Sequence, residues 1–471
     1  MVFNSLTFMV FFALVLALHA MPFKWTTKKI NLLIASYLFY AAWNPPFIIL
    51  LWLSTIVDWF AAQKLVRAEK PLERKVWMLL SVIVNLGMLA YFKYGTFMLE
   101  NFSALMAGIG VSYQAPGFDI ILPVGISFYT FATLSYTLDI YLRRAEPAKN
   151  FLDYALFVTF FPHLVAGPIM RPTELVPQFV EPRKATADML RFGLALMTLG
   201  LFQKVVLADS FLAPAAEIIY DGSSVPGLLD SWIATLAFSG QIFCDFAGYS
   251  TTAIGAAMCL GFAMPDNFRF LYAAIGFSDF WRRWHISLST WFRDYLYIPL
   301  GGNRHGEART YLALMVTMLL GGLWHGASWT FVVWGGLHGF YLAVERIIRS
   351  RFSGYRPGPF ALVLFGLLTY FLINISWVFF RADSFGKAWL ILNGMFGMNA
   401  KAEPILPTMH VAMVMLIVIG IVFSHWQMRQ QTLESFLARV PAFVLSSVWA
   451  LMAFAVVIAQ GDGNAFIYFQ F

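Results

Sequence analysis

Apolar segments long enough to cross a membrane recur along the whole chain, separated by short polar links. A helix needs about 17 to 25 mostly apolar residues to cross the hydrocarbon core of a bilayer. The pattern therefore predicts an all-α polytopic membrane protein with about 11 to 13 membrane segments. The clearest expected crossings are residues 5–21, 30–43, 46–63, 75–93, 121–142, 190–208, 228–262, 309–345, 360–380, 410–426 and 440–460.

Two of these segments, 228–262 and 309–345, are too long for one simple crossing and contain glycine clusters. We expect broken or re-entrant helices there, because non-helical backbone at membrane depth needs protein or a water-filled cavity to satisfy it. No polar stretch is long enough to fold separately, so we expect a single integral membrane domain over residues 1–471.

Composition and charge agree with a membrane protein. Hydrophobic residues make up 60% of the chain and charged residues 12%, against a usual charged share of about 25% in soluble domains. Much of the net charge of +7 comes from basic links at 24–29, 64–75 and 143–149. The positive-inside rule places these links in the cytoplasm. Topology thus explains the charge, and we expect no nucleic-acid partner.

The stretch 267–306 departs from the apolar pattern, because arginines and aromatic residues are mixed throughout it. One interpretation is an interfacial amphipathic helix with aromatic rings at headgroup depth. The other is a polar hairpin that enters at Gly276 and dips into the bundle, which explains a histidine on an aromatic face. On a continuous helix that face would hold Trp281, Trp284, His285, Leu288, Trp291, Phe292 and Tyr295.

His325 stands out among the 8 histidines because it lies in an uncharged run, residues 310–344. An ionisable residue within a membrane segment points to function, although a neutral imidazole hydrogen-bonded across helices is the alternative. His338 follows in the same run but falls on a different face of a continuous helix. Solvation, snorkelling or helix capping accounts for His305, His19, His410 and His425, and His163 is ambiguous.

The sequence gives little support for a metal site or a catalytic nucleophile. Stacked haems could use two histidines on one helix, but His410 and His425, the only possible second pair, are poorly phased. No zinc-ligand spacing, phosphate-binding loop or serine nucleophile elbow is present in the sequence. Cys244 and Cys259 would stand about 22 Å apart on one helix, too far for a disulfide. We expect no metal.

The motif "DFWRRWHISLSTWFRDYLYIPLGGNR", followed by "TMLLGGLWHGASWTFVVWGGLHG", resembles the membrane-bound O-acyltransferase family, in its bacterial alginate O-acetylation branch. The similarity extends along nearly the whole chain, through "ILPVGISFYTF", "FPHLVAGPIMRP", "FCDFAGYSTTAIG" and a closing "FIYFQF". One departure is that alginate-type members carry an Asp after "GYS", where this chain has Thr251 and Thr252. The acceptor polymer therefore stays open between alginate, cellulose, peptidoglycan and similar surface polymers.

The resemblance implies a ring of membrane helices around a central tunnel. It makes His325, in "LWHGASW", the catalytic histidine and His285, in "WRRWHIS", the second functional position. We expect His325 to act as general base, because a buried imidazole stays neutral and ready to take a proton. His285 would orient the acceptor or donate to the thioester oxygen. The expected substrate-binding residues are Trp281, Trp284, Trp324, Ser328, Asp245 and Asn267.

The resemblance also implies the substrates and the location. We expect no permanently bound cofactor, an acyl thioester such as acetyl-coenzyme A as donor, and a polysaccharide hydroxyl as final acceptor. A periplasmic acetyltransferase or esterase-like partner is expected at the bacterial inner membrane, with lipid around the chain. The rival interpretation is a transporter or channel whose histidines line a proton or solute pathway.

Overall fold

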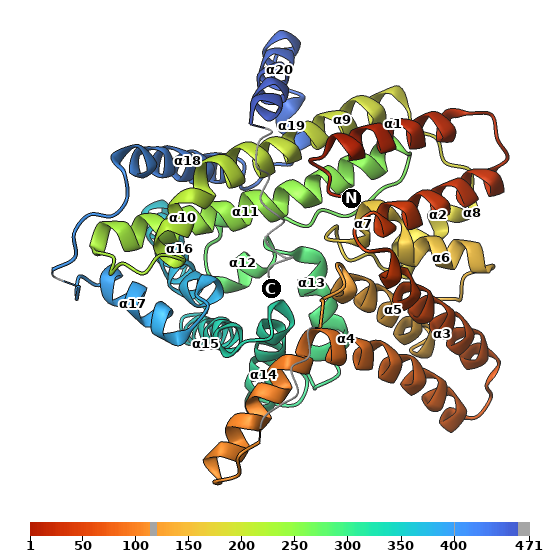
Figure 1. The fold of residues 1–471 in the computed structure, drawn as a ribbon, viewed down its shortest axis with the longest axis horizontal. Coiled ribbons are helices and arrows are strands. Elements are labelled where there is room, and N and C mark those ends of the chain that lie inside the picture. The colour runs from red at the N-terminus through yellow and green to blue at the C-terminus, as the bar shows by residue number, and fades with distance from the viewer. Residues whose placement is uncertain (114–119, 400, 460–471) are drawn as a thin grey trace. The chain divides into compact units, whose positions relative to one another are not determined.

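The computed structural model describes residues 1–113, 120–399 and 401–459, and every regular element in these ranges is a helix (Figure 1). The predicted all-α fold is confirmed. The residues of the closing "FIYFQF" motif lie outside the described ranges. The chain forms two compact units, one of Met1–Leu194 with Ala253–Pro265 and one of Ala195–Thr252 with Asp266–Phe471. A single membrane domain over residues 1–471 stays a prediction.

Two helices of the first unit begin after a residue whose side chain caps them. Ser5 caps α1 by accepting from the N–H of Phe8, and Asn150 caps α6 by accepting from Asp153. A buried ion pair between Lys29 and Asp153 links α2 to α6. The elements are α1 (Leu6–Ala20), α2 (Trp25–Ala41), η1 (Pro45–Phe47), α3 (Ile48–Arg67), α4 (Pro71–Gly108), α5 (Ile126–Tyr141), α6 (Phe151–Thr159), α7 (Phe161–Leu164) and α8 (Pro172–Val180).

The helices α9 (Ala187–Leu201) and α11 (Leu228–Cys259) contribute residues to both units. The remaining elements belong to the second unit. They are η2 (Phe202–Leu212), α10 (Ala213–Tyr220), η3 (Leu271–Ala273), α12 (Phe277–Trp281), α13 (Ile286–Phe292), η4 (Arg293–Tyr297), α14 (Glu307–His325), α15 (Trp329–Arg351), α16 (Pro359–Arg381), α17 (Phe385–Met395), α18 (Thr408–Gln427), α19 (Leu433–Leu437) and α20 (Ala442–Ile458).

Within the described residues, 6 helical stretches are long and apolar enough to cross a membrane, and α1 and α20 are shorter apolar helices. By this measure the crossings are fewer than the expected 11 to 13, because several predicted segments form short helices or helices with a more polar composition. The 6 stretches are Pro45–Arg67, Pro71–Gly108, Ala187–Tyr220, Trp329–Arg351, Pro359–Arg381 and Thr408–Gln427.

The two long glycine-containing segments turn out differently. The predicted break in 228–262 is absent between Leu228 and Cys259, because these 32 residues form one continuous helix, α11 (Figure 1). The prediction is wrong for this part of the segment. Its glycines serve close packing instead: a Cβ at Gly248 would stand 2.6 Å from the backbone oxygen of Gly200. Cys244 and Cys259 both lie on this helix as free thiols.

The break predicted in 309–345 is confirmed. The helix α14 ends at His325, and α15 begins at Trp329 after a short extended link. Glycines bring the two helices together: a Cβ at Gly322 would stand 2.2 Å from the backbone oxygen of Phe331, and one at Gly335 the same distance from that of Met318. This close packing of α14 on α15 fixes the position of His325 at the end of α14.

The aromatic stretch is not one continuous helix, so the single aromatic face expected from Trp281 to Tyr295 does not form. It consists of α12, α13 and the π-helical turn η4, with His285 in the left-handed region at φ 43° between α12 and α13. The entry point is Gly276, as the hairpin interpretation predicts, with φ +86°. His285 and Trp284 are fully buried inside the second unit, which favours the hairpin over an interfacial helix.

Candidate active site

His325 is the last residue of α14 and is 2% exposed. Aromatic rings enclose its imidazole edge to face, with centroids at 4.9 Å for Trp334, 5.0 Å for Trp324 and 5.3 Å for Phe380. The C-terminal end of a helix carries partial negative charge and stabilises a nearby cation. An imidazolium formed at His325 would therefore gain stability from α14.

His285 is held in place by Asn267. The Oδ1 atom of Asn267 accepts hydrogen bonds from the Ser287 N–H and hydroxyl, at 3.2 and 2.8 Å, and lies 3.2 Å from His285 Nδ1. Because the Ser287 N–H is a donor only, this Asn267 atom is the oxygen, and His285 Nδ1 carries the proton. Burial lowers the pKa of His285 to about 3, so the ring is neutral with Nε2 as its basic nitrogen.

The structure brings His285 and His325 together. Their ring centroids lie 6.4 Å apart, and Trp324 contacts both, at 5.9 Å from His285 and 5.0 Å from His325. Phe246, on α11, packs edge to face on His285 at 4.7 Å. Two buried imidazoles with aromatic walls are thus the centre of the candidate site.

The other two tryptophans of the expected site are Trp281, the last residue of α12, and Trp284, which follows it. Trp281 packs on Trp334 at 5.9 Å and on His338 at 5.2 Å. Trp284 is fully buried and packs on Trp377 at 5.3 Å. Both rings support the walls around the two histidines.

Ser328 and Asp245 make structural contacts in the described residues. Ser328 caps α15, where its hydroxyl accepts from the Thr330 N–H at 3.3 Å. Asp245, 2% exposed on α11, forms an ion pair with Lys204, which also binds Asp209 at 2.8 Å. Asp245 directly precedes Phe246, so this buried cluster fixes the part of α11 that packs on His285.

His338 lies on α15, whereas His325 lies on α14. Stacked haems would need both histidines on one helix, so this placement argues against the haem alternative. Its Nε2 atom lies 3.1 Å from the Ser376 hydroxyl, which donates its own proton to the Ile373 carbonyl at 2.7 Å. The His338 Nε2 therefore carries a proton and donates it to Ser376. This hydrogen bond joins α15 to α16.

Sequence reasoning missed several residues that build the site. Trp334 and Phe380 pack on His325, and Phe246 packs on His285. These apolar rings carry no motif of their own. A weak signal existed for Trp334, because it lies one helical turn before His338 within the uncharged run.

Comparison with known proteins identifies the family of this chain. The model of the membrane-bound O-acyltransferase family matches residues 142–361. A probable alginate O-acetylase of Azotobacter vinelandii is 41% identical over 399 residues, which is 84% of this chain and 78% of the relative. The chain belongs to the membrane-bound O-acyltransferase family. It is therefore a membrane O-acyltransferase, and family membership favours the enzyme over a transporter or channel.

Two further relatives are named for other cell-surface polymers. A peptidoglycan O-acetyltransferase of Helicobacter pylori is 37% identical over 400 residues, 79% of this chain and 74% of the relative. A teichoic acid D-alanyltransferase of Streptococcus thermophilus is 29% identical over 240 residues, 47% of this chain and 56% of the relative. The matches thus include proteins named for three different cell-surface polymers.

Proposed function

We propose that this membrane O-acyltransferase moves an acetyl group from a cytoplasmic acyl thioester, acetyl-coenzyme A, to a hydroxyl on the other side of the bacterial inner membrane. The product is an O-acetylated surface polysaccharide. The observation that carries the proposal is the pair of buried imidazoles, His285 and His325, with ring centroids 6.4 Å apart. The alginate and peptidoglycan acetyltransferases among the relatives support acetyl as the group transferred.

In the proposed reaction His325 is the general base. Its imidazole takes the proton of the acceptor hydroxyl as the hydroxyl oxygen attacks the thioester carbonyl carbon. The C–O ester bond forms, the C–S bond breaks, and the leaving thiolate takes the proton from the imidazolium. The position of His325 at the end of α14 favours this role, since the imidazolium is stabilised there.

His285 would act differently from His325. With its proton on Nδ1 bound to Asn267, the neutral ring offers only the Nε2 lone pair to a substrate. Such a nitrogen accepts a hydrogen bond and cannot donate one. The reacting hydroxyl gives its single proton to His325, so we assign His285 to orienting the acceptor through a neighbouring hydroxyl, and not to donating to the thioester oxygen.

The acceptor is a polymer hydroxyl or a group that passes the acetyl on to it. A serine of a periplasmic partner protein would serve as such an intermediate carrier, and a soluble partner suits a chain built of membrane helices. The aromatic walls formed by Trp324, Trp334 and Phe380 give the reaction a low-polarity surrounding that excludes water from the thioester.

The proposal is tested in cells by replacing His325 with alanine and measuring acetyl ester in the surface polysaccharide. We expect the ester to fall at least 100-fold, because general-base catalysis contributes about 10²- to 10⁴-fold. His305→Ala is the matched control, since His305 is exposed in a loop. Unchanged acetylation in His325→Ala cells with normal protein levels would contradict the proposal.

A further inference from the structure

One face of α15 carries four large side chains on successive turns: Trp334, His338, Tyr341 and Glu345. Spacings of three and four residues place side chains on the same face of a helix. Trp334 contacts His325 of the site, and His338, Tyr341 and Glu345 contact residues of α12. At 1.5 Å per residue, the face extends about 16 Å from Trp334 to Glu345.

The first part of this face packs on the site and on α12. Trp334 contacts the His325 ring at 4.9 Å. His338 stacks on Phe280 at 5.8 Å, and one turn later Tyr341 stacks on Phe277 at 4.5 Å. The hydrogen bond from His338 to Ser376 keeps its ring in this orientation.

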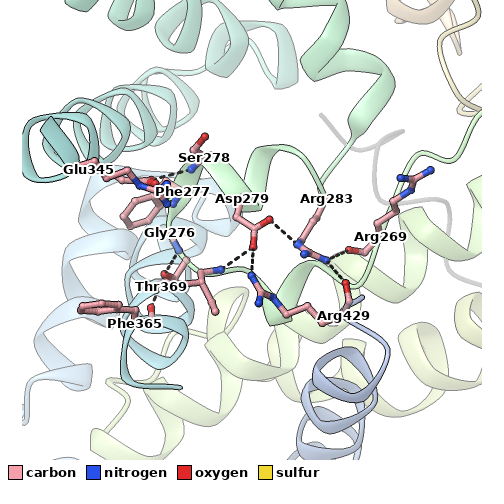
Figure 2. A network of polar contacts seen from close by, with 12 residues as sticks. Arg269, Gly276, Phe277, Ser278, Asp279, Arg283, Glu345, Phe365, Thr369 and Arg429 are labelled. Carbon is pink, nitrogen blue, oxygen red and sulfur yellow. Dashed lines mark hydrogen bonds and ion pairs between the residues drawn. The ribbon is translucent and has the colours of Figure 1, made fainter. Parts of the chain in front are cut away.

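The far end of the face holds the start of α12 (Figure 2). The Oε2 atom of Glu345 accepts hydrogen bonds from the N–H groups of Phe277, at 2.6 Å, and Ser278, at 2.9 Å. Gly276 has φ +86°, and a Cβ there would stand 2.7 Å from Glu345 Oε1. A side chain at position 276 would be strained at this φ and would displace the Glu345 carboxylate, and the two hydrogen bonds need a side-chain oxygen at position 345.

Two further side chains, those of Thr369 and Asp279, fix the same segment (Figure 2). Thr369, on α16, accepts from the Gly276 N–H at 2.9 Å. Asp279 accepts from the Ile275 N–H and binds Arg283 and Arg429. Burial alone would raise the pKa of Asp279, but these hydrogen bonds and positive charges outweigh it and lower the pKa below its ordinary value. The carboxylate thus remains charged and keeps both arginines.

We propose that this face of α15 is a positioning element that sets the place of His285 relative to His325. One end touches His325 through Trp334, and the other end fixes α12 through Glu345. His285 follows α12 closely in the chain, so a displacement of α12 carries His285 with it. The inference rests on the proposed catalytic roles of the two histidines.

Loss of the contact between Glu345 and the start of α12 should slow the reaction and leave donor binding unchanged. A misplacement of about 1 Å in a reacting group costs on the order of 100-fold in rate. Glu345 and Gly276 do not touch a bound donor in this account. Their loss therefore lowers kcat, the rate per folded enzyme molecule, and leaves KM for acetyl-coenzyme A within about twofold. A general loss of folded protein would instead lower the amount of enzyme and leave the rate per folded molecule unchanged.

The test compares Glu345→Ala, Gly276→Ala and Glu345→Gln with Arg349→Gln. Arg349 pairs with Glu345 at 2.7 Å but is 60% exposed, so its loss leaves the backbone hydrogen bonds intact. Thiol release from acetyl-coenzyme A is measured in membrane vesicles of producing cells, which retain the natural acceptor. We expect at least a 10-fold lower kcat for Glu345→Ala and Gly276→Ala, no further loss when the two are combined, and near-normal rates for Glu345→Gln and Arg349→Gln.

A second readout measures position without activity. Spin labels at Arg282, which is exposed, and at Leu320, which is 44% exposed on α14, report the distance between the His285 segment and the helix of His325. We expect this distance distribution to shift or broaden in Glu345→Ala and Gly276→Ala, and to stay unchanged in Arg349→Gln. Thr369→Val, which removes one acceptor, should show a smaller broadening and serves if the stronger variants fail to fold.

The inference is overturned if Glu345→Ala and Gly276→Ala, or Thr369→Val in their place, keep the normal rate and distance distribution, or if Arg349→Gln impairs both equally. His325→Ala separates this failure from failure of the proposed function. An inactive His325→Ala beside fully active Glu345→Ala would reject only the positioning role. A fully active His325→Ala would reject the proposed function itself.

Discussion

At the scale of single residues, the chemistry of the site depends on which imidazole nitrogens carry protons. Asn267 Oδ1 fixes the proton of His285 on Nδ1, and the hydroxyl of Ser376 fixes that of His338 on Nε2. The neutral ring of His285 can therefore accept a hydrogen bond from a hydroxyl but cannot protonate a leaving group. His325, at the end of α14, is left as the residue suited to hold a proton during the reaction.

The Asn267→Asp variant tests the state of His285 directly. A carboxylate at this position would favour the charged imidazolium and raise the pKa of His285 from about 3. The reactive form is neutral, so activity should fall as the pH drops through the raised pKa, while the wild-type enzyme shows no loss from His285 between about pH 5 and 8. The pH dependence of kcat measures this.

Ser287→Ala is the matched control for that profile, because it removes one donor to Asn267 and leaves the Asn267–His285 contact. Its pH profile should follow that of the wild type. Identical profiles for Asn267→Asp and wild type would show that Asn267 does not determine the protonation of His285.

At the scale of elements, glycine clusters predicted two breaks, of which the one in 309–345 is present and the one in 228–262 is absent up to Cys259. Gly322 and Gly326 flag the end of α14, and the break at His325 is present. The glycines of α11 instead allow helices to approach, which a sequence cannot distinguish from a break. The interruption at His285 depends on contacts from distant residues, Asn267 and Glu345, so local helix periodicity could not show it.

The hairpin of α14 and α15 gives a prediction at this scale. Gly322→Ala would place a Cβ 2.2 Å from the Phe331 backbone oxygen, and backbone cannot move aside cheaply. We expect a loss of about 1 to 3 kcal/mol of stability, typical of overpacking, together with lower activity because His325 ends the displaced helix. Thermal unfolding of the purified protein in detergent measures the stability.

Gly336→Ala is the control for the hairpin, since its Cβ would meet only the Leu319 side chain at 3.4 Å. It should be neutral or gain up to about 1 kcal/mol, because alanine favours helix over glycine. Equal unfolding temperatures for the two variants would mean that close contact at Gly322 does not hold the hairpin together.

At the scale of the whole molecule, composition and apolar segments were enough to predict an all-α membrane protein, and long motifs were enough to predict its family. The site was predicted in part: the motifs named His285 and His325, and the structure places their rings 6.4 Å apart. The walls formed by Phe246, Trp334 and Phe380 come from three separate helices. Their convergence depends on tertiary packing, which no local pattern encodes.

The most direct test of the central claim is the transfer rate of purified His325→Ala protein in lipid vesicles, measured as thiol released from acetyl-coenzyme A in the presence of the polymer or partner acceptor. We expect a kcat lowered by about 10²- to 10⁴-fold, with acetyl-coenzyme A still binding and with His305→Ala as active as wild type. A His325→Ala protein that transfers acetyl at the wild-type rate would contradict it.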